Sequence, residues 1–219
     1  GRSAGLAMTT GDYNIAIGFE AADALAGNAN NNIAIGKSAL GGTSNACLHN
    51  IAIGTNALGH ASYAAAAINL AIGLDAGLAI TSGNGNVLIG HEAGGAITDH
   101  NENTAVGYDA LKTSVGENNT CLGRETLMTL GNGNYNTAIG GGAMKLADGT
   151  ESHNVAVGHA TLLNINSDTA NNNVAVGNNA GRYTTAGGAG TAVTNVINGV
   201  YLGFETNSVA AAGATNEIV

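Results

Sequence analysis

The sequence predicts an all-β fold, a parallel β-solenoid built from one repeated coil. Three observations predict it. A short motif returns along the 219 residues at nearly constant spacing, the apolar residues inside the motif lie two positions apart, and glycine and asparagine crowd the segments between copies. A fixed period of this size is typical of solenoids, and an apolar period of two indicates a β-strand.

The motif is a pentapeptide of asparagine, an aliphatic residue or threonine, a small residue, a second aliphatic residue and glycine. Eleven copies share one register, and they begin at Asn14, Asn32, Asn50, Asn69, Asn86, Asn103, Asn119, Asn136, Asn154, Asn173 and, in a degenerate form, Gly199. The closing glycines recur every 16–19 residues, with a final step of 26, and Ala or Thr stands three positions after each of them. We therefore expect about 12 coils of 16–19 residues.

The two aliphatic positions of each motif predict the side of the strand that faces the interior of the coil. The expected coil core is Ile15, Ile17, Ile33, Ile35, Ile51, Ile53, Ile72, Ile89, Val106, Leu122, Ile139, Val157 and Val176. A second short strand is expected around the Ala or Thr that follows the glycine. All length variation falls after that position, which predicts an outer loop there.

The small residue at the centre of the motif then points away from that core, and it predicts a seam between chains. It is Ala in eight of eleven copies, and the predicted seam is Ala16, Ala34, Ala52, Ala71, Leu88, Ala105, Cys121, Ala138, Ala156, Ala175 and Tyr201. One coil offers few large side chains to bury, so a further buried surface is expected. We expect a parallel homotrimer that closes along this seam.

The repeat predicts the organisation of the chain. Residues 1–180 form the repeat array, residues 181–198 an expanded loop, and residues 199–219 degenerate terminal coils. The first four residues match the back half of a copy and Glu217–Val219 the front half of another. We expect a piece of a longer array, with a further C-terminal region.

Composition excludes several classes of protein. Charged residues make up 10% of the chain and apolar residues 44%, the opposite of a disordered segment. A formal net charge of −9 with six Lys and Arg residues lacks the basic surface that nucleic-acid binding needs. No apolar run is long enough to span a membrane. With two cysteines, expected on coils about 19 Å apart, an intrachain disulfide is excluded if the fold is correct.

Acidic residues recur two positions after the glycine, and four lie on consecutive coils: Asp75, Glu92, Asp109 and Glu125. Stacked carboxylates repel one another unless they are solvated or hold cations. We expect a solvated acidic edge, with a cation-binding column as the weaker alternative. No other metal site and no cofactor are expected.

Large side chains stand one position after the glycine in half of the coils: Phe19, Leu74, His91, Tyr108, His159 and Phe204. They predict packing across a chain boundary or, as the alternative, a platform for sugar rings. The six histidines show no zinc spacing and are expected to be solvated turn residues. Cys121 is expected to act as a small buried apolar residue, and Cys47 to lie in an outer loop. The runs Gly140–Gly142 and Gly187–Gly190 lack the lysine and helix of a phosphate-binding loop.

The repeated Asn-aliphatic-Ala-Ile-Gly-x-x-Ala pattern resembles the YadA-type head of trimeric autotransporter adhesins and, equally, the repeat shafts of phage tail fibres. The resemblance covers nearly the whole chain. It implies a left-handed parallel β-roll wound by each of three chains. The coils here are longer than the adhesin repeat, which is nearer 14 residues in that family, and the ending resembles the segment before an intramolecular chaperone in phage fibres. Both departures favour the phage type.

The predicted function is therefore a structural and adhesive segment of an extracellular fibre, on a virion tail or a bacterial surface. It would be a rigid, non-enzymatic spacer that presents a receptor-binding tip. Its expected partners are two further copies, adjoining fibre segments and a glycan or protein receptor. The alternatives are the head of a bacterial trimeric adhesin, a trimeric β-helix acyltransferase and an ice-binding solenoid. The acyltransferase is disfavoured because that class needs a hexapeptide repeat on all three faces of each coil, and the matching stretch, as in Ile17–Ala21, occurs once per coil. The ice-binding solenoid is disfavoured because the threonines are scattered.

Overall fold

A computed structural model describes residues 1–42, 47–59, 66–165, 170–182 and 197–206. The chain divides into two units, Gly1–Tyr108 and Asp109–Val219. Each unit is a parallel β-solenoid, and neither contains a helix among its described residues. Accordingly, no helix in this part of the chain is long and apolar enough to cross a membrane. The boundary between the units falls inside the predicted repeat array.

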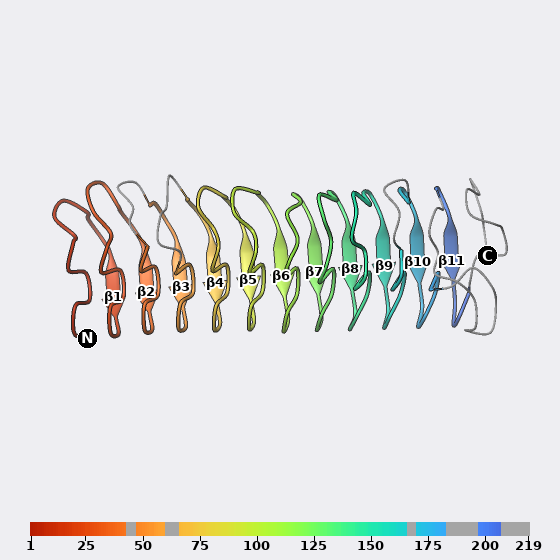
Figure 1. Cartoon of the computed structure of the whole chain (residues 1–219), viewed down its shortest axis with the longest axis horizontal. Helices are drawn as coiled ribbons and strands as arrows, with labels where there is room; N and C mark the ends of the chain where they lie inside the picture. The colour runs from red at the N-terminus through yellow and green to blue at the C-terminus, as the bar shows by residue number, and fades with distance from the viewer. Residues whose placement is uncertain (43–46, 60–65, 166–169, 183–196, 207–219) are drawn as a thin grey trace. The chain divides into compact units, whose positions relative to one another are not determined.

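Every strand is three residues long and forms the centre of one pentapeptide. The first unit holds β1 (Ile15–Ile17), β2 (Ile33–Ile35), β3 (Ile51–Ile53), β4 (Leu70–Ile72), β5 (Val87–Ile89) and β6 (Thr104–Val106). The second holds β7 (Thr120–Leu122), β8 (Thr137–Ile139), β9 (Val155–Val157), β10 (Val174–Val176) and β11 (Val200–Leu202). Within each unit every strand lies parallel to the next one in chain order (Figure 1).

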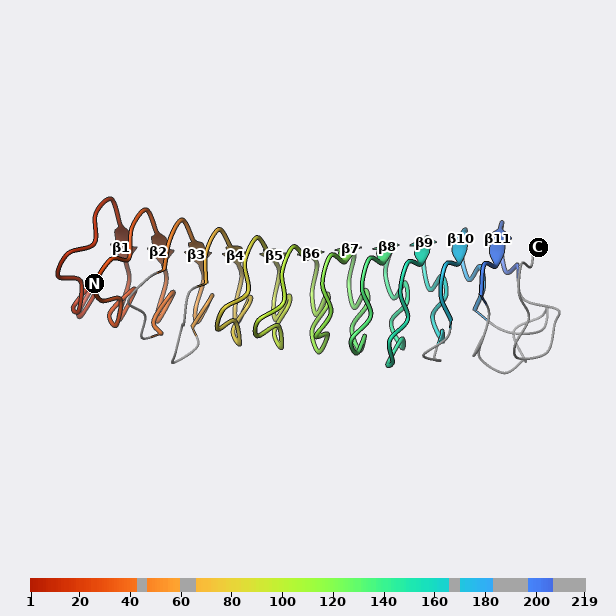
Figure 2. The ribbon, with the colours of Figure 1, turned by 90° about the horizontal axis from the view of Figure 1, so that it is seen from above.

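The strands stack in register, so equivalent residues of successive copies are neighbours. Ala34 of β2, for example, pairs with Ala16 of β1 on one side and with Ala52 of β3 on the other. In both units the strands follow one edge of the coils and the longer loops lie on the other (Figure 2). The repeat register read from the sequence is therefore the stacking register of the fold.

The second strand predicted around the Ala or Thr after each glycine is wrong, because the chain turns there instead. No strand forms at that position in the described residues, where the backbone enters the left-handed region of φ. In the coil after β3, Asn56 has φ 54° and Leu58 has φ 48°. A strand needs extended backbone with negative φ, which residues in this left-handed conformation do not have. Single backbone hydrogen bonds still join the coils, such as that from the N–H of Leu58 to the carbonyl of Ala76 at 3.0 Å.

The glycine that ends each strand has two reasons to lack a side chain. Its φ lies between 119° and 144° in every copy, where a Cβ atom is strongly disfavoured. A Cβ built on Gly54 would also lie 2.4 Å from the carbonyl oxygen of Gly73 on the next coil, and one built on Gly140 would lie 2.5 Å from that of Gly158. The glycines thus allow successive coils to approach closely at this corner.

The predicted orientation of the strand residues is also wrong: the small central residue faces the interior and the two aliphatic residues face outward. Ala105 is fully buried, as are Ala34, Ala52, Ala71, Leu88, Cys121, Ala138, Ala156, Ala175 and Tyr201, while Ala16 in the first strand is half-buried. The residues predicted as coil core are half-buried or exposed; Ile17 is 56% exposed and Leu122 49%.

The interior leaves little room for the central residue of the strand, because large side chains fill the side of the coil opposite the strand. Buried large side chains come from the fourth and seventh positions after the glycine: Leu40, Leu58, Leu111, Leu127, Met144 and Leu162, and Leu25, Ile80, Ile97, Leu130 and Ile165. Only a methyl group fits opposite these chains in most coils, so the strand contributes alanine. The sequence pattern identified the correct two faces and assigned them to the wrong sides.

The two large exceptions to alanine confirm this orientation, because glycine makes room for each. Leu88 lies where other copies have alanine, and Cβ atoms built on Gly77 and Gly94 would lie 2.9 Å and 2.6 Å from its methyl groups. Tyr201 is matched by Gly181, whose Cβ would lie 3.2 Å from the ring. Six other coils carry leucine or methionine where these glycines stand. Volume is thus conserved across the interior.

The asparagine that opens each motif forms a buried ladder of side-chain amides. The Oδ1 atom of Asn136 accepts hydrogen bonds from the backbone N–H and the Nδ2 of Asn154, at 3.0 and 3.2 Å. Its own Nδ2 donates to the carbonyl of Glu151 at 2.7 Å. The same arrangement repeats from coil to coil in both units. Buried amides require such partners, which explains why this position is asparagine.

Candidate functional site

The most extensive candidate surface is the outward side of the strands. Each strand presents its first and third residues, which are Ile, Leu, Val or, at three positions, Thr: Thr104, Thr120 and Thr137. In the first unit these side chains form two parallel columns on β1–β6, and in the second unit they do so on β7–β11. Apolar side chains gathered at every level of a sheet mark an interaction surface.

The four acids of the predicted cation column lie on turns, and three have protein partners that the structure identifies. Asp75 accepts a hydrogen bond from Asn56 Nδ2 at 2.9 Å, Asp109 pairs with Lys112 at 3.2 Å, and Glu125 pairs with Arg124 at 2.6 Å and with Lys145. The hydrogen bond from Lys145, followed by that from Arg124, lowers the pKa of Glu125 below its ordinary value.

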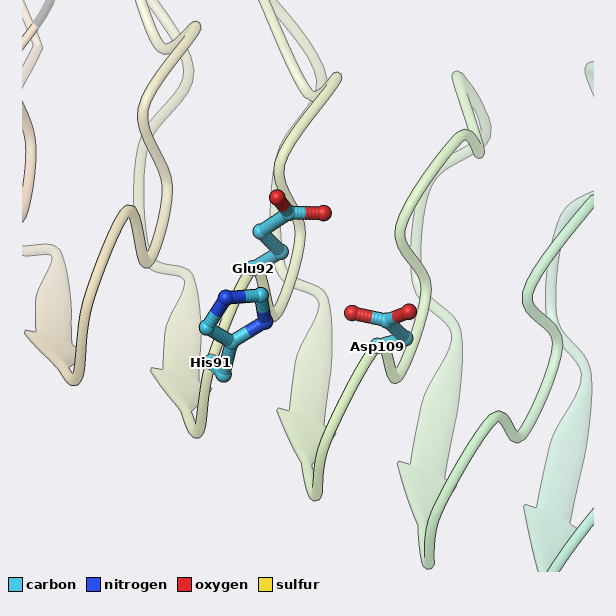
Figure 3. A group of neighbouring side chains, drawn as sticks. All are labelled: His91, Glu92 and Asp109. Carbon is cyan, nitrogen blue, oxygen red and sulfur yellow. The ribbon is translucent and has the colours of Figure 1, made fainter.

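The backbone supplies a reason for the two aspartates at this position that involves no ligand. All four have φ between 51° and 56°, and Asp and Asn enter this region more readily than most residues. Figure 3 shows His91 and Glu92 on the turn after β5 and Asp109 on the turn after β6. Because Asp109 opens the second unit, these three residues do not make up a site of either unit. The cation column stays a prediction.

The large side chains after the glycine are exposed or half-buried, and two of them stack on each other. The rings of His91 and Tyr108 lie parallel, 4.8 Å apart between centroids. Phe19, Leu74 and Phe204 are 42%, 43% and 71% exposed. The stack is a contact between coils of one unit. The sequence predicted packing across a chain boundary or a platform for sugar rings, and neither prediction included this contact.

The histidines do not gather on one site among the described residues. His153 stacks on Tyr135, with ring centroids 5.1 Å apart, and His100 lies 3.1 Å from Asp99. A hydrogen bond from Thr98 and, next, the neighbouring His100 lower the pKa of Asp99. His60 lies outside the described residues, as do Gly187–Gly190, most of the predicted expanded loop and most of the terminal coils.

Both cysteines are buried. Cys121 occupies the interior of its coil, where burial raises the pKa of its thiol, and so it acts as a small apolar residue on the opposite side from the predicted seam. Cys47 is buried too, and its carbonyl accepts a hydrogen bond from Asn32 Nδ2 at 2.9 Å. The sequence predicts Cys47 in an outer loop, and the structure shows that its side chain is buried there.

Sequence reasoning missed a basic pocket in the second unit. A cavity of about 400 Å³ is lined by residues of the turns after β7, β8, β9 and β10: Arg124, Glu125, Gly141, Gly142, Lys145, His159, Ala160, Leu163 and Arg182. The available signal was the pair Gly141–Gly142, which removes two side chains where most coils carry them.

Comparison of the chain with models of protein families, with characterised proteins and with solved structures finds no match.

Proposed function

We propose that this chain is a structural and adhesive segment of an extracellular homotrimeric fibre of the phage tail fibre type. In this proposal three copies lie parallel, and their outward strand residues meet along a common axis. The segment acts as a rigid spacer that presents a receptor-binding tip. The observation that carries the proposal is the row of outward aliphatic side chains on every strand.

The physical argument concerns solvent. A single chain leaves two columns of Ile, Val and Leu side chains partly exposed, and burying this area against copies of itself is favourable. Parallel copies place identical coils at the same level, so each level buries the same residues and the contact extends with the array. The number three and the left-handed coil come from the resemblance to adhesin heads and fibre shafts.

Rigidity is supported by the contacts between coils. Glycine backbones touch at one corner, asparagine amides join each coil to the next, and the sequence contains no proline to interrupt the hydrogen bonds between strands. A chain held at each coil by the same contacts suits a spacer. These features support a load-carrying role.

The test is the mass of the particle in solution and the change in that mass when a charged residue is placed on the outward side of a strand. Sedimentation velocity of the parent chain should give about 64 kDa (3 × 21.4 kDa) and an elongated shape. Ile53→Glu places a carboxylate on the outward side of β3, where a trimer would bury it, so the mass should fall to that of one chain. Leu6→Glu is the matched control, since Leu6 is 75% exposed and precedes the strands.

The control should keep the mass of the parent. A parent chain that sediments as a compact 21.4 kDa monomer would contradict the proposal. Equal masses for Ile53→Glu and Leu6→Glu would also contradict it, because the sheet side would then be no interface.

A further inference from the structure

The basic pocket of the second unit arises from an interruption of the repeat. After each strand but one, the first and second residues beyond the glycine carry side chains. In the coil after β8 both are glycine, Gly141 and Gly142, and in the next coil the second is Ala160. A Cβ atom built on Gly141 would meet only His159 Cδ2, at 3.7 Å, and one built on Gly142 only Leu163 Cδ1, also at 3.7 Å. The glycines therefore leave open space between two populated coils.

The charge around this space is opposite to that of the chain. The protein has six Lys and Arg residues and a formal charge of −9, yet three of the six, Arg124, Lys145 and Arg182, line this one cavity. Glu125 is the one carboxylate of the lining, which leaves a formal charge of +2 (3 − 1). Three cations that line one open cavity create a positive local potential that favours an anion.

The donors come from different coils and are held in place. Arg124 Nη2 contacts Glu125 Oε1 at 2.6 Å, and Lys145 binds the second oxygen of the same carboxylate. Arg182 Nη1 donates to Asn179 Oδ1 at 3.1 Å, which orients its guanidinium in the lining of the cavity. Guanidinium groups bind planar carboxylates through paired hydrogen bonds.

The lining discriminates between anions. The Glu125 carboxylate repels a dianion more than a monoanion, and its oxygens accept hydrogen bonds from hydroxyl groups. A cavity of about 400 Å³ lies within the usual range for small-molecule sites. We propose that this pocket binds an acidic sugar, a polyhydroxylated ring with one carboxylate, with the carboxylate between Arg182 and Arg124 and hydroxyl groups toward Glu125 and His159.

This inference goes beyond the fibre proposal and does not depend on it. All lining residues lie on turns of the second unit and none on the outward side of a strand. A monomer would hold the complete pocket. Sedimentation tests the trimer and ligand titration tests the pocket, so the two can fail separately.

The experiment is titration calorimetry of the full chain with sodium glucuronate, with glucose as the neutral match and sodium sulfate as the plain anion. Glucuronate should bind at least 10-fold more tightly than either. Arg182→Gln should weaken glucuronate binding by about 10-fold or more, because one charged hydrogen-bond partner is lost. Gly141→Leu fills the cavity at a position that has no positive φ, and it should abolish binding.

Lys112→Gln is the control, because it removes the same charge from the same unit while lying outside the lining. It should change the glucuronate affinity less than twofold, and circular dichroism should show that all three variants fold. No binding of glucuronate by the parent chain overturns the proposal. So does equal binding of glucose or of sulfate, or a loss with Lys112→Gln that equals the loss with Arg182→Gln.

Discussion

Adjacent glycine residues can have different roles in the structure, as Gly140 and Gly141 show. Gly140 has φ 122° and a neighbouring carbonyl 2.5 Å from the place of a Cβ, whereas Gly141 has neither constraint. The motif marks Gly140 as a repeat position and says nothing about Gly141. Only the fold reveals that the second glycine keeps a pocket open.

We predict that Gly140→Ala destabilises the chain by about 3 kcal/mol or more, because the backbone must leave its conformation and the next coil must move. Gly141→Ala should change the free energy of unfolding by less than about 1 kcal/mol. Chemical denaturation of both variants and the parent measures the difference. Equal effects would mean that the stacked glycines are not in contact.

The charge pair at Glu125 predicts a pH dependence of stability. Lys145 and Arg124 lower the pKa of this carboxyl in the folded chain below its ordinary value of 4.5. A lowered folded pKa stabilises the fold above the unfolded value, and this contribution is lost as the pH falls from about 4.5 through the folded pKa. Glu125→Gln and Lys145→Gln should therefore each lose less melting temperature than the parent between pH 7 and pH 3. A parent and a Glu125→Gln variant with identical pH profiles would contradict this.

At the scale of the strand, sequence reasoning located every element and misjudged its orientation. The pentapeptides coincide with β1–β11 and their register is the observed stacking. Alternation alone cannot say which side of a strand is inside. The information lay elsewhere in the repeat, in the leucine four positions after the glycine and in the glycine that replaces it beside Leu88 and Tyr201.

We predict that Leu88 and Gly94 are coupled across the interior. Leu88→Ala should cost about 2–5 kcal/mol by leaving a cavity, and Gly94→Leu alone should cost about 1–3 kcal/mol by overpacking. The double variant restores the alanine and leucine of other coils, where Leu58 tolerates φ 48°. It should be more stable than Leu88→Ala alone, as urea denaturation of the three variants would measure. An additive loss would contradict the packing described here.

At the scale of the whole molecule, the repeated contacts predict a solenoid that behaves as a series of similar neighbours. The sequence predicted the all-β parallel class because eleven copies impose one register. It did not predict the left-handed backbone turns, because residues such as Ile68, with φ 57°, carry no turn signal. The basic pocket also escaped prediction, since Arg124 and Arg182 are 58 positions apart (182 − 124) and meet only when coils stack.

The amide ladder also has a direction and an end. The Oδ1 of each asparagine accepts hydrogen bonds from the following coil. At the last described coil the position is Gly199, whose N–H donates to Asn173 Oδ1 at 2.8 Å. Glycine can donate its N–H to the preceding asparagine, but it has no side-chain oxygen to accept a hydrogen bond from the next coil. A coil stacked on this one would therefore lack the side-chain amide bond that aligns each preceding coil, so the alignment carried by asparagine ends at residue 199.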